Sequence, residues 1–342
     1  MPVTTNRPLR GAALMLVALA LPLTAAAITL GGGGDARALD KSQKFDFSAA
    51  PAATAGTYVA TQAEGKLKGV KRVAITNMCV QFVNAKSASG FSGGATISYA
   101  RSASGGIPGG LDPVRMQAVA DGWLDAIEAD LAALGIEVVP YEQLAANDLF
   151  RKFAAKYDSG IRVGARSDTN NQKGDTGETV VYVSPRGRPF APDCGQISPA
   201  STGTFVRMAY PLNAEFLTVS ALIDLGEAKS SGGLLRGARA DIDYVQYLRA
   251  GDSQFQFVGK TGPGARLWLK QSIVPQENPF TLGDKSTSRA TESRMALDGT
   301  VSTERTATTA QEIGFNEDLY YRNATESLTA MHRMFLQKFA GK

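Results

Sequence analysis

The stretch that decides the fold is residues 112–144, DPVRMQAVADGWLDAIEADLAALGIEVVPYEQL. Asp112 and Pro113 are typical of a helix start, because Asp caps free backbone amides and Pro needs no donor in the first turn. Apolar residues then recur every three or four positions as far as Leu134, and Gly135 is typical of a helix end. This pattern predicts a helix followed by a short strand over 136–139.

A strand precedes this helix in the sequence. Residues 70–83 are rich in β-branched and apolar side chains and are bounded by Gly69 and Asn84. A strand, a crossover helix and a second strand place two parallel strands in one sheet. A further helix is expected over 141–157. We therefore predict an α/β fold, with α+β as the alternative, built on a mixed β-sheet with crossover helices in the first half.

The second half of the chain is rich in predicted strands. Alternating or continuous apolar runs predict strands over 178–183, 215–225, 238–247 and 265–274. Asp298-Gly299, within residues 294–304, indicates a hairpin, because both central positions of a tight turn need positive φ. The chain ends in an amphipathic helix over 316–339, which we expect to pack on the sheet with His332 at the edge of its buried stripe.

The N-terminus has the pattern of a signal peptide. Arg7 and Arg10 precede an apolar run over 11–23 and a small-residue cleavage site that ends at Ala27, with a second such site at Ala38. The apolar run is shorter than the roughly 20 residues that a membrane-spanning helix needs. No cysteine follows either site, and no later run approaches spanning length. We expect a periplasmic or secreted protein without a lipid anchor and without a transmembrane helix after cleavage.

Composition divides the mature chain into three parts. Residues 28–65 are rich in Ala, Gly, Thr and Ser, so we expect a flexible extended leader. Residues 66–342 are long enough for one large α/β domain. Within this domain, the Gly/Ser-rich insertion at 87–110 predicts a long flexible loop or an irregular hairpin.

Charge and cysteine content narrow the possible partners. The formal net charge is +4, and removal of Arg7 and Arg10 leaves +2 with no basic stripe, so we expect no nucleic-acid partner. Cys79 and Cys194 are the only cysteines. After export they either form a disulfide, which persists in an oxidising compartment, or remain two buried thiols.

The sequence lacks the residues of common catalytic sites. It has a single histidine, and its two cysteines are far apart, so a zinc site is not expected. Gly251-Asp252-Ser253 lacks the Asp-x-x-His partner of one esterase class, and Gly259-Lys260-Thr261 lacks the leading glycine of a phosphate loop. We therefore expect no enzyme activity, no catalytic residues, no cofactor and no metal.

One segment of the Gly/Ser-rich insertion is a candidate interaction loop. Along residues 91–99, Phe91, Ile97 and Tyr99 alternate with small polar residues, as in a strand with an aromatic residue at each end. Such a segment is either an ordinary mobile hairpin or edge strand, or a membrane-inserting strand that gives the protein a peripheral outer-membrane contact. The region 286–306 carries charge on both faces of its hairpin, which lipid would not tolerate.

Residues 70–144 resemble a known envelope domain. The strand 71–75, the helix end 131–135 and the segment 136–144 are similar to the α/β domain shared by three groups of proteins. These are the curli secretion channel lipoprotein, the lipoprotein activators of peptidoglycan synthases and the N-terminal domain of the Tol-Pal translocation protein. This chain lacks the lipid-attachment cysteine of the first two groups. The resemblance implies a non-enzymatic envelope domain.

Two functions follow as expectations. The first is a non-enzymatic exported protein that acts in interaction or assembly with another cell-envelope component, either an envelope protein or a peptidoglycan-associated partner. The second is a periplasmic carrier or binding protein for a small apolar ligand, held between the sheet and the helices near Trp123 and Trp268.

Overall fold

The computed structural model describes residues 39–93, 97–157, 159–170, 174–190, 194, 199–232, 238–295 and 301–340. The signal peptide and its two cleavage sites lie outside these ranges. So does the turn predicted at Asp298-Gly299, although the two strands that flank it are described.

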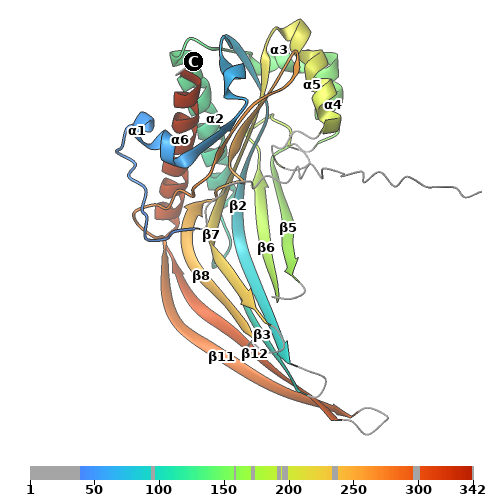
Figure 1. The fold of residues 1–342 in the computed structure, drawn as a ribbon, viewed down its shortest axis with the longest axis vertical. Coiled ribbons are helices and arrows are strands. Elements are labelled where there is room, and N and C mark those ends of the chain that lie inside the picture. Colours follow the sequence, from blue (N-terminus) through green and yellow to red (C-terminus); the bar gives the residue numbers. More distant parts are fainter. Residues whose placement is uncertain are drawn as a thin grey trace, which may run out of the picture. The chain divides into compact units, whose positions relative to one another are not determined.

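The described strands form one mixed twelve-stranded sheet (Figure 1), which confirms the predicted α/β class. The strands are β1 (Val59–Gln62), β2 (Arg72–Gly93), β3 (Ile97–Gly106), β4 (Glu137–Val138), β5 (Ile161–Asn170), β6 (Gly174–Val183), β7 (Glu215–Ser231), β8 (Arg239–Leu248), β9 (Gln254–Gly259), β10 (Gly262–Leu269), β11 (Phe280–Met295) and β12 (Val301–Phe315). The main order is β1-β10-β9-β7-β2-β3-β12-β11, and β4, β6 and β8 branch from it, with β5 paired to β6.

The predicted crossover is confirmed. β2 pairs in parallel with β4, and helix α2 (Pro113–Ala133) connects the β2–β3 hairpin to β4. Asp112 caps α2 by accepting a hydrogen bond from the backbone N–H of Val114 at 2.8 Å. β2 also pairs in parallel with β7 from Val73 to Phe82, and from Val80 onward its other neighbour is the antiparallel β6.

Helices cover both faces of this part of the sheet. α1 (Pro51–Tyr58), α2 and α6 (Glu317–Ala340) pack with one core, and α4 (Asp148–Ala154) and α5 (Pro199–Leu212) pack with a second core that includes Ala74 and Phe216. The single helix expected over 141–157 is wrong. Residues 141–145 form α3 (Tyr141–Ala145), and the side chain of Asn147 then accepts hydrogen bonds from the N–H groups of Leu149 and Phe150 and starts α4. A 3-10 turn, η1 (Glu64–Leu67), follows β1.

The leader expected over 28–65 is ordered where it is described. It contains α1 and β1, and β1 pairs with β10 from Val59 to Gln62. Phe45, Tyr58 and Val59 are buried, and the rings of Phe45 and Tyr58 lie 5.0 Å apart. Composition misled the prediction, because these few large side chains bury enough apolar area to fix a segment otherwise made of small residues.

Four hairpins continue beyond the helices: β2–β3, β5–β6, β7–β8 and β11–β12 (Figure 1). The Gly/Ser-rich insertion at 87–110 is therefore a regular antiparallel hairpin over most of its length, with Ala85 paired to Gly106 and Gly93 to Ser98. β12 joins this hairpin by pairing in parallel with β3, from Thr303 opposite Ile97 to Thr309 opposite Ala103.

His332 is fully buried, so the expectation that it packs partly at the edge of the helix is wrong. It joins α6 to α2. The indole N–H of Trp123 donates to His332 Nδ1 at 3.2 Å, so the ring proton lies on Nε2, which donates to Asp130 at 2.8 Å. Burial lowers the pKa of His332 below its ordinary value of 6.5, against the attraction of Asp130.

This contact makes stability depend on pH. The folded chain holds His332 neutral, whereas the unfolded chain protonates it as the pH falls through about 6.5, so the free energy of unfolding should fall from pH 7.5 to pH 5.5. Urea titrations at both pH values measure this. His332→Gln should make the difference between the two pH values smaller, and a variant with the same pH dependence as wild type would contradict the assignment.

Candidate interaction surface

The hairpins are anchored where β7 leaves β2. Beyond Phe82 and Ile223 these two strands no longer pair, β3 takes the place of β7 beside β2, and β7 continues with β8. The β7–β8 register shifts between Asp224 and Gly226. Gly226 has a φ of 155°, and a side-chain carbon there would lie 2.2 Å from the carbonyl oxygen of Asp243, so only glycine fits the shift.

A buried ionic cluster fills this fork. Lys86 on β2 lies 2.7 Å from Glu178 on β6 and 2.9 Å from Asp224 on β7. Arg249, just after β8, is also ion-paired with both carboxylates, and the hydroxyl of Tyr247 donates to Asp224 at 2.6 Å. The side chain of Lys86 is 3% exposed and that of Asp224 is 0% exposed. Lys86 and Asp224 are thus buried at the centre of the cluster, and Arg249 and Glu178 are partly exposed at its edge.

The cluster shifts the titration of its members. Burial alone would raise the pKa of Glu178, but hydrogen bonds and Coulombic attraction from Arg249 and Lys86 outweigh it and lower the pKa to about 2. Burial, the charge of Asp224 and the hydrogen bond to it raise the pKa of Tyr247. The cluster joins β2, β6, β7 and the end of β8 at one point.

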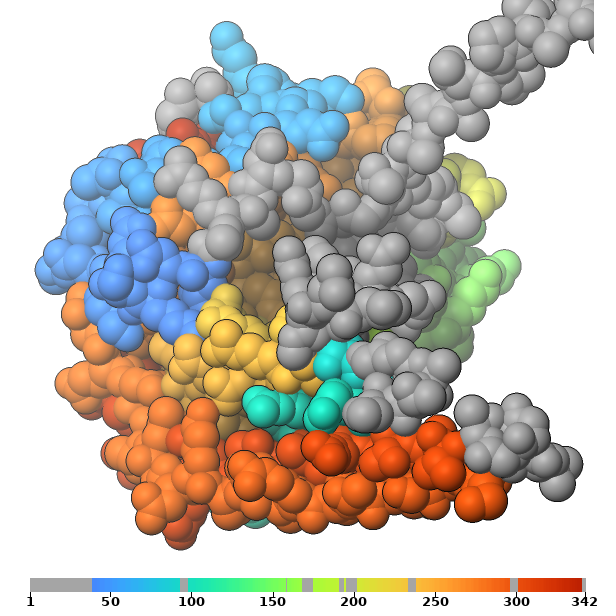
Figure 2. All heavy atoms as spheres, turned by 60° about the horizontal axis from the view of Figure 1, so that its bottom comes forward, coloured from blue at the N-terminus to red at the C-terminus, as the bar shows by residue number. Residues whose placement is uncertain are grey.

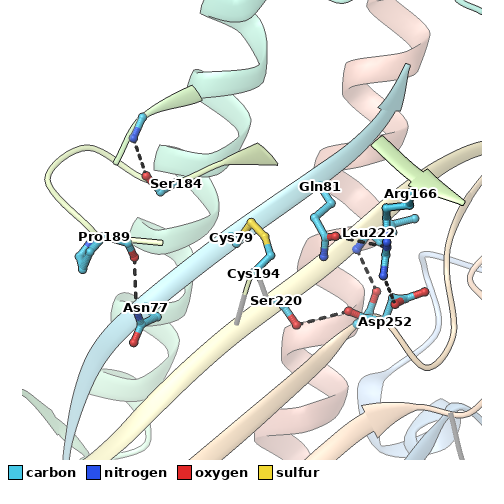
Figure 3. Close-up of a disulfide and its surroundings, with 12 residues drawn as sticks. Asn77, Cys79, Gln81, Arg166, Ser184, Pro189, Cys194, Ser220, Leu222 and Asp252 are labelled. Atoms are coloured by element: carbon cyan, nitrogen blue, oxygen red, sulfur yellow. Dashed lines mark hydrogen bonds and ion pairs between the residues drawn. A yellow bond between two sulfur atoms is a disulfide. The ribbon is translucent and has the colours of Figure 1, made fainter. Parts of the chain in front are cut away.

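The predicted pairing of Cys79 with Cys194 is present in the structure (Figure 3). Cys79 lies in the middle of β2, and the two Cα atoms are 5.4 Å apart across a separation of 115 residues. Phe190 and Tyr182 pack around the bridge. Two residues farther along β2, Arg166 of β5 donates to Gln81 at 3.4 Å and to Asp252 at 3.3 Å.

Beyond this anchor, the β11–β12 hairpin is exposed almost throughout. Every residue of β11 after Phe280 is exposed, and β12 alternates between exposed and half-buried residues. Among the described residues, β11 pairs with β12 alone, so its outer edge is free. Nothing of this ribbon belongs to the hydrophobic core beyond its base at Phe280, Ile313 and Phe315.

Of the candidate segment 91–99, residues 91–93 end β2 and residues 97–99 begin the antiparallel β3, as in the hairpin alternative, and residues 94–96 lie outside the described ranges. Phe91 pairs with Ala100, and Tyr99 pairs with Ser92. Because directly paired residues share a face, Phe91 and Tyr99 point to opposite faces of the hairpin. Both are exposed, at 56% and 42%. The backbone of Ile97 begins β3, and its side chain lies outside the described residues.

The two tryptophans expected to line a ligand pocket lie in different environments. Trp123 is buried and bonded to His332, whereas Trp268 on β10 is half-buried beneath the guanidinium of Arg266. A cavity of about 340 Å³ lies between helix α6 and the segment that leads into the start of α1. Neither tryptophan lines it. Its walls are Phe45, Phe47, Ala49, Pro51, Thr54, Thr325, Glu326, Thr329, Ala330, Arg333 and Met334.

Metal-ligating clusters and membrane-spanning helices can also be searched for in the described residues. No three metal-ligating side chains gather anywhere in the described ranges. None of the helices described is long and apolar enough to cross a membrane. The ionic cluster was not predicted from the sequence. Asp224 interrupts the apolar strand predicted over 215–225, and a carboxylate in such a position indicates a buried polar contact.

The chain matches no protein-family model, no curated protein and no solved structure.

The fork cluster yields a test of the anchor. Lys86→Met leaves two buried carboxylates with one cation and should lower the free energy of unfolding by about 3–5 kcal/mol. Lys285→Met removes a comparable lysine–aspartate pair on the exposed ribbon, where Lys285 lies 3.0 Å from Asp241, and should cost less than about 1 kcal/mol. Equal losses in urea denaturation would show that the cluster does not anchor the hairpins.

The disulfide yields a second test. Replacing both cysteines, as Cys79→Ser with Cys194→Ser, should lower the free energy of unfolding by roughly 2–4 kcal/mol, because the bridge closes a long loop. A reductant should lower the stability of the wild-type protein to that of the double variant and leave the variant unchanged. Titration of two free thiols in the oxidised wild-type protein would contradict the bridge.

Proposed function

We propose that this protein is a non-enzymatic, exported envelope protein that docks on another cell-envelope component through its projecting hairpins. The observation that carries this proposal is the β11–β12 ribbon. Its strands extend over sixteen and fifteen residues, β12 pairs with β3 only from Thr303 to Thr309, and β11 is exposed after its first residue and pairs with β12 alone among the described residues. A surface of that length with a free strand edge has the properties of a docking surface.

The ribbon resists indiscriminate pairing by its own composition. Charged residues recur along β11, among them Lys285, Arg289, Glu292 and Arg294. Charges on an edge strand disfavour aggregation while leaving room for a partner of matching charge. The signal-peptide pattern of residues 1–27 and the resemblance of residues 70–144 to non-enzymatic envelope domains support a periplasmic or secreted location for this contact.

A carrier role for a small apolar ligand is the second candidate, and one observation favours it. The cavity beside α6 has Phe45, Phe47 and Met334 in its walls, and its volume is within the range of small-molecule sites. This role would use that cavity rather than the surroundings of Trp123 and Trp268. Native mass spectrometry of the purified protein tests it, and a protein that carries no co-purified ligand would count against it.

Docking by the ribbon predicts a change in accessibility. Thr291→Cys and Ser288→Cys place single thiols on the two faces of β11, and Val114→Cys places one on the 76% exposed Val114 of α2. In purified protein a maleimide should label all three. In isolated envelopes we expect at least one ribbon position to be labelled several-fold more slowly, with Val114→Cys unchanged. Equal labelling of both ribbon positions in the two preparations would overturn the proposal.

A further inference from the structure

The two faces of the projecting sheet carry opposite charge. Paired residues share a face, so the registers of β3, β12 and β11 sort their side chains into two sets. Among the residues that these registers pair, one set, here called the basic face, contains four cationic residues and no carboxylate: Arg101, Lys285, Arg289 and Arg305. Among the paired residues, the opposite face contains Glu292, Glu304 and Arg294, whereas Asp284 and Glu312 lie at the register shift beside Lys285 and are not sorted by the pairing.

Three arginines of the basic face converge on one residue. Ala307 of β12 is paired with Arg101 of β3 on one side and with Arg289 of β11 on the other. Arg305 precedes Ala307 by two residues on the same strand and the same face. Since neighbouring strands lie about 5 Å apart, the three Cα atoms surround the small Ala307 within roughly 10 Å of one another. Three arginines around a small alanine on one face can bring their guanidinium groups to one anionic group.

These arginines have no carboxylate to neutralise them. All three are exposed, and none forms an ion pair with any residue in the described part of the chain. Arg305 lies over the ring of Tyr99, 5.7 Å from its centroid, and Lys285 is already paired with Asp241 of β8. Like charges so close together repel one another, and a bound anion relieves that repulsion.

Apolar side chains lie next to the arginines, toward the tip of the hairpins. Tyr99 is paired with Arg305, and Met295 is paired with Val301 at the last described pair of the ribbon. They share the basic face and are 42%, 75% and 47% exposed. Figure 2 shows this end of the hairpins, where the β2–β3 segment (teal) lies between β7–β8 (yellow) and β11–β12 (orange to red).

From this arrangement we propose that the basic face binds the phosphate groups of an anionic lipid surface, with Tyr99, Met295 and Val301 resting at the level of the headgroups. The proposal rests on the proposed docking function and names its partner class. The guanidinium group of an arginine can donate two parallel hydrogen bonds to the oxygens of one phosphate. Aromatic residues are favoured at the level of the lipid headgroups, where one end is apolar and the other is hydrated. A soluble polyanion would use the arginines but would gain nothing from the exposed apolar tip. The glutamates on the opposite face keep the ribbon out of the hydrocarbon.

Vesicle sedimentation of the purified protein tests the proposal. Wild-type protein should bind phosphatidylglycerol vesicles at low salt and should bind phosphatidylcholine vesicles much more weakly. The variant Arg101→Gln, Arg289→Gln, Arg305→Gln should bind phosphatidylglycerol vesicles roughly 100-fold more weakly, at about fivefold per arginine. The matched control Arg151→Gln, Arg186→Gln, Arg322→Gln removes the same charge from exposed sites on the helical side and should bind like wild type.

A second variant separates lipid from a soluble polyanion. Tyr99→Ser with Met295→Ser should weaken vesicle binding at both low and high salt and leave binding to inorganic polyphosphate unchanged, because screening acts on the arginines alone. Equal loss in the two arginine variants, or vesicle binding that does not depend on Tyr99 and Met295, would overturn the proposal. Protection of Thr291→Cys or Ser288→Cys in envelopes, with no vesicle binding, would overturn the lipid partner and leave the docking function standing.

Discussion

The projecting part of this protein depends on Asp224. This carboxylate is fully buried where β7 and β2 separate, and Lys86, Arg249 and Tyr247 all bond to it. The hairpins beyond the fork have little core of their own, so their direction is set at their base. Replacing the cluster by apolar residues of similar volume could hold the strands equally well, but apolar contacts lack the fixed directions of hydrogen bonds. We infer that the cluster fixes the orientation in which the strands leave the fork, in addition to stabilising the fold.

The same division between base and tip separates what sequence reasoning found from what it missed. The strand at 70–83, the helix at 113–134 and the C-terminal helix carry long apolar patterns, and the structure has each of them. The ends of β2, β11 and β12 consist mostly of small or polar residues, and β11 is exposed along its length after Phe280, so no apolar period marks them. α5 was missed as well, although Phe205 and Met208 of this helix are buried.

Less of the candidate site than of the fold can be predicted from the sequence. Cys79 and Cys194 were identified as a possible pair because only two cysteines exist, and Phe91 and Tyr99 were singled out by their spacing. Arg101, Arg289 and Arg305 gave no signal, because they come together only through the register of β12 against β3 and β11. A shift of one residue in either pairing would move a member to the other face. Such a site is defined by long-range register, which local patterns do not contain.

The parallel pairing of β12 with β3 has a consequence for how the chain reaches this state. Ser102 and Thr308, whose hydroxyls lie 3.1 Å apart in this pairing, are separated by 206 residues. Contacts so distant in sequence form late and slow the folding reaction. Until the last quarter of the chain has emerged and folded, the edge of β3 is open along its whole length. That strand contains several serines and alanines and so has little apolar surface. Its unpaired edge therefore has a low tendency to pair with other chains and aggregate.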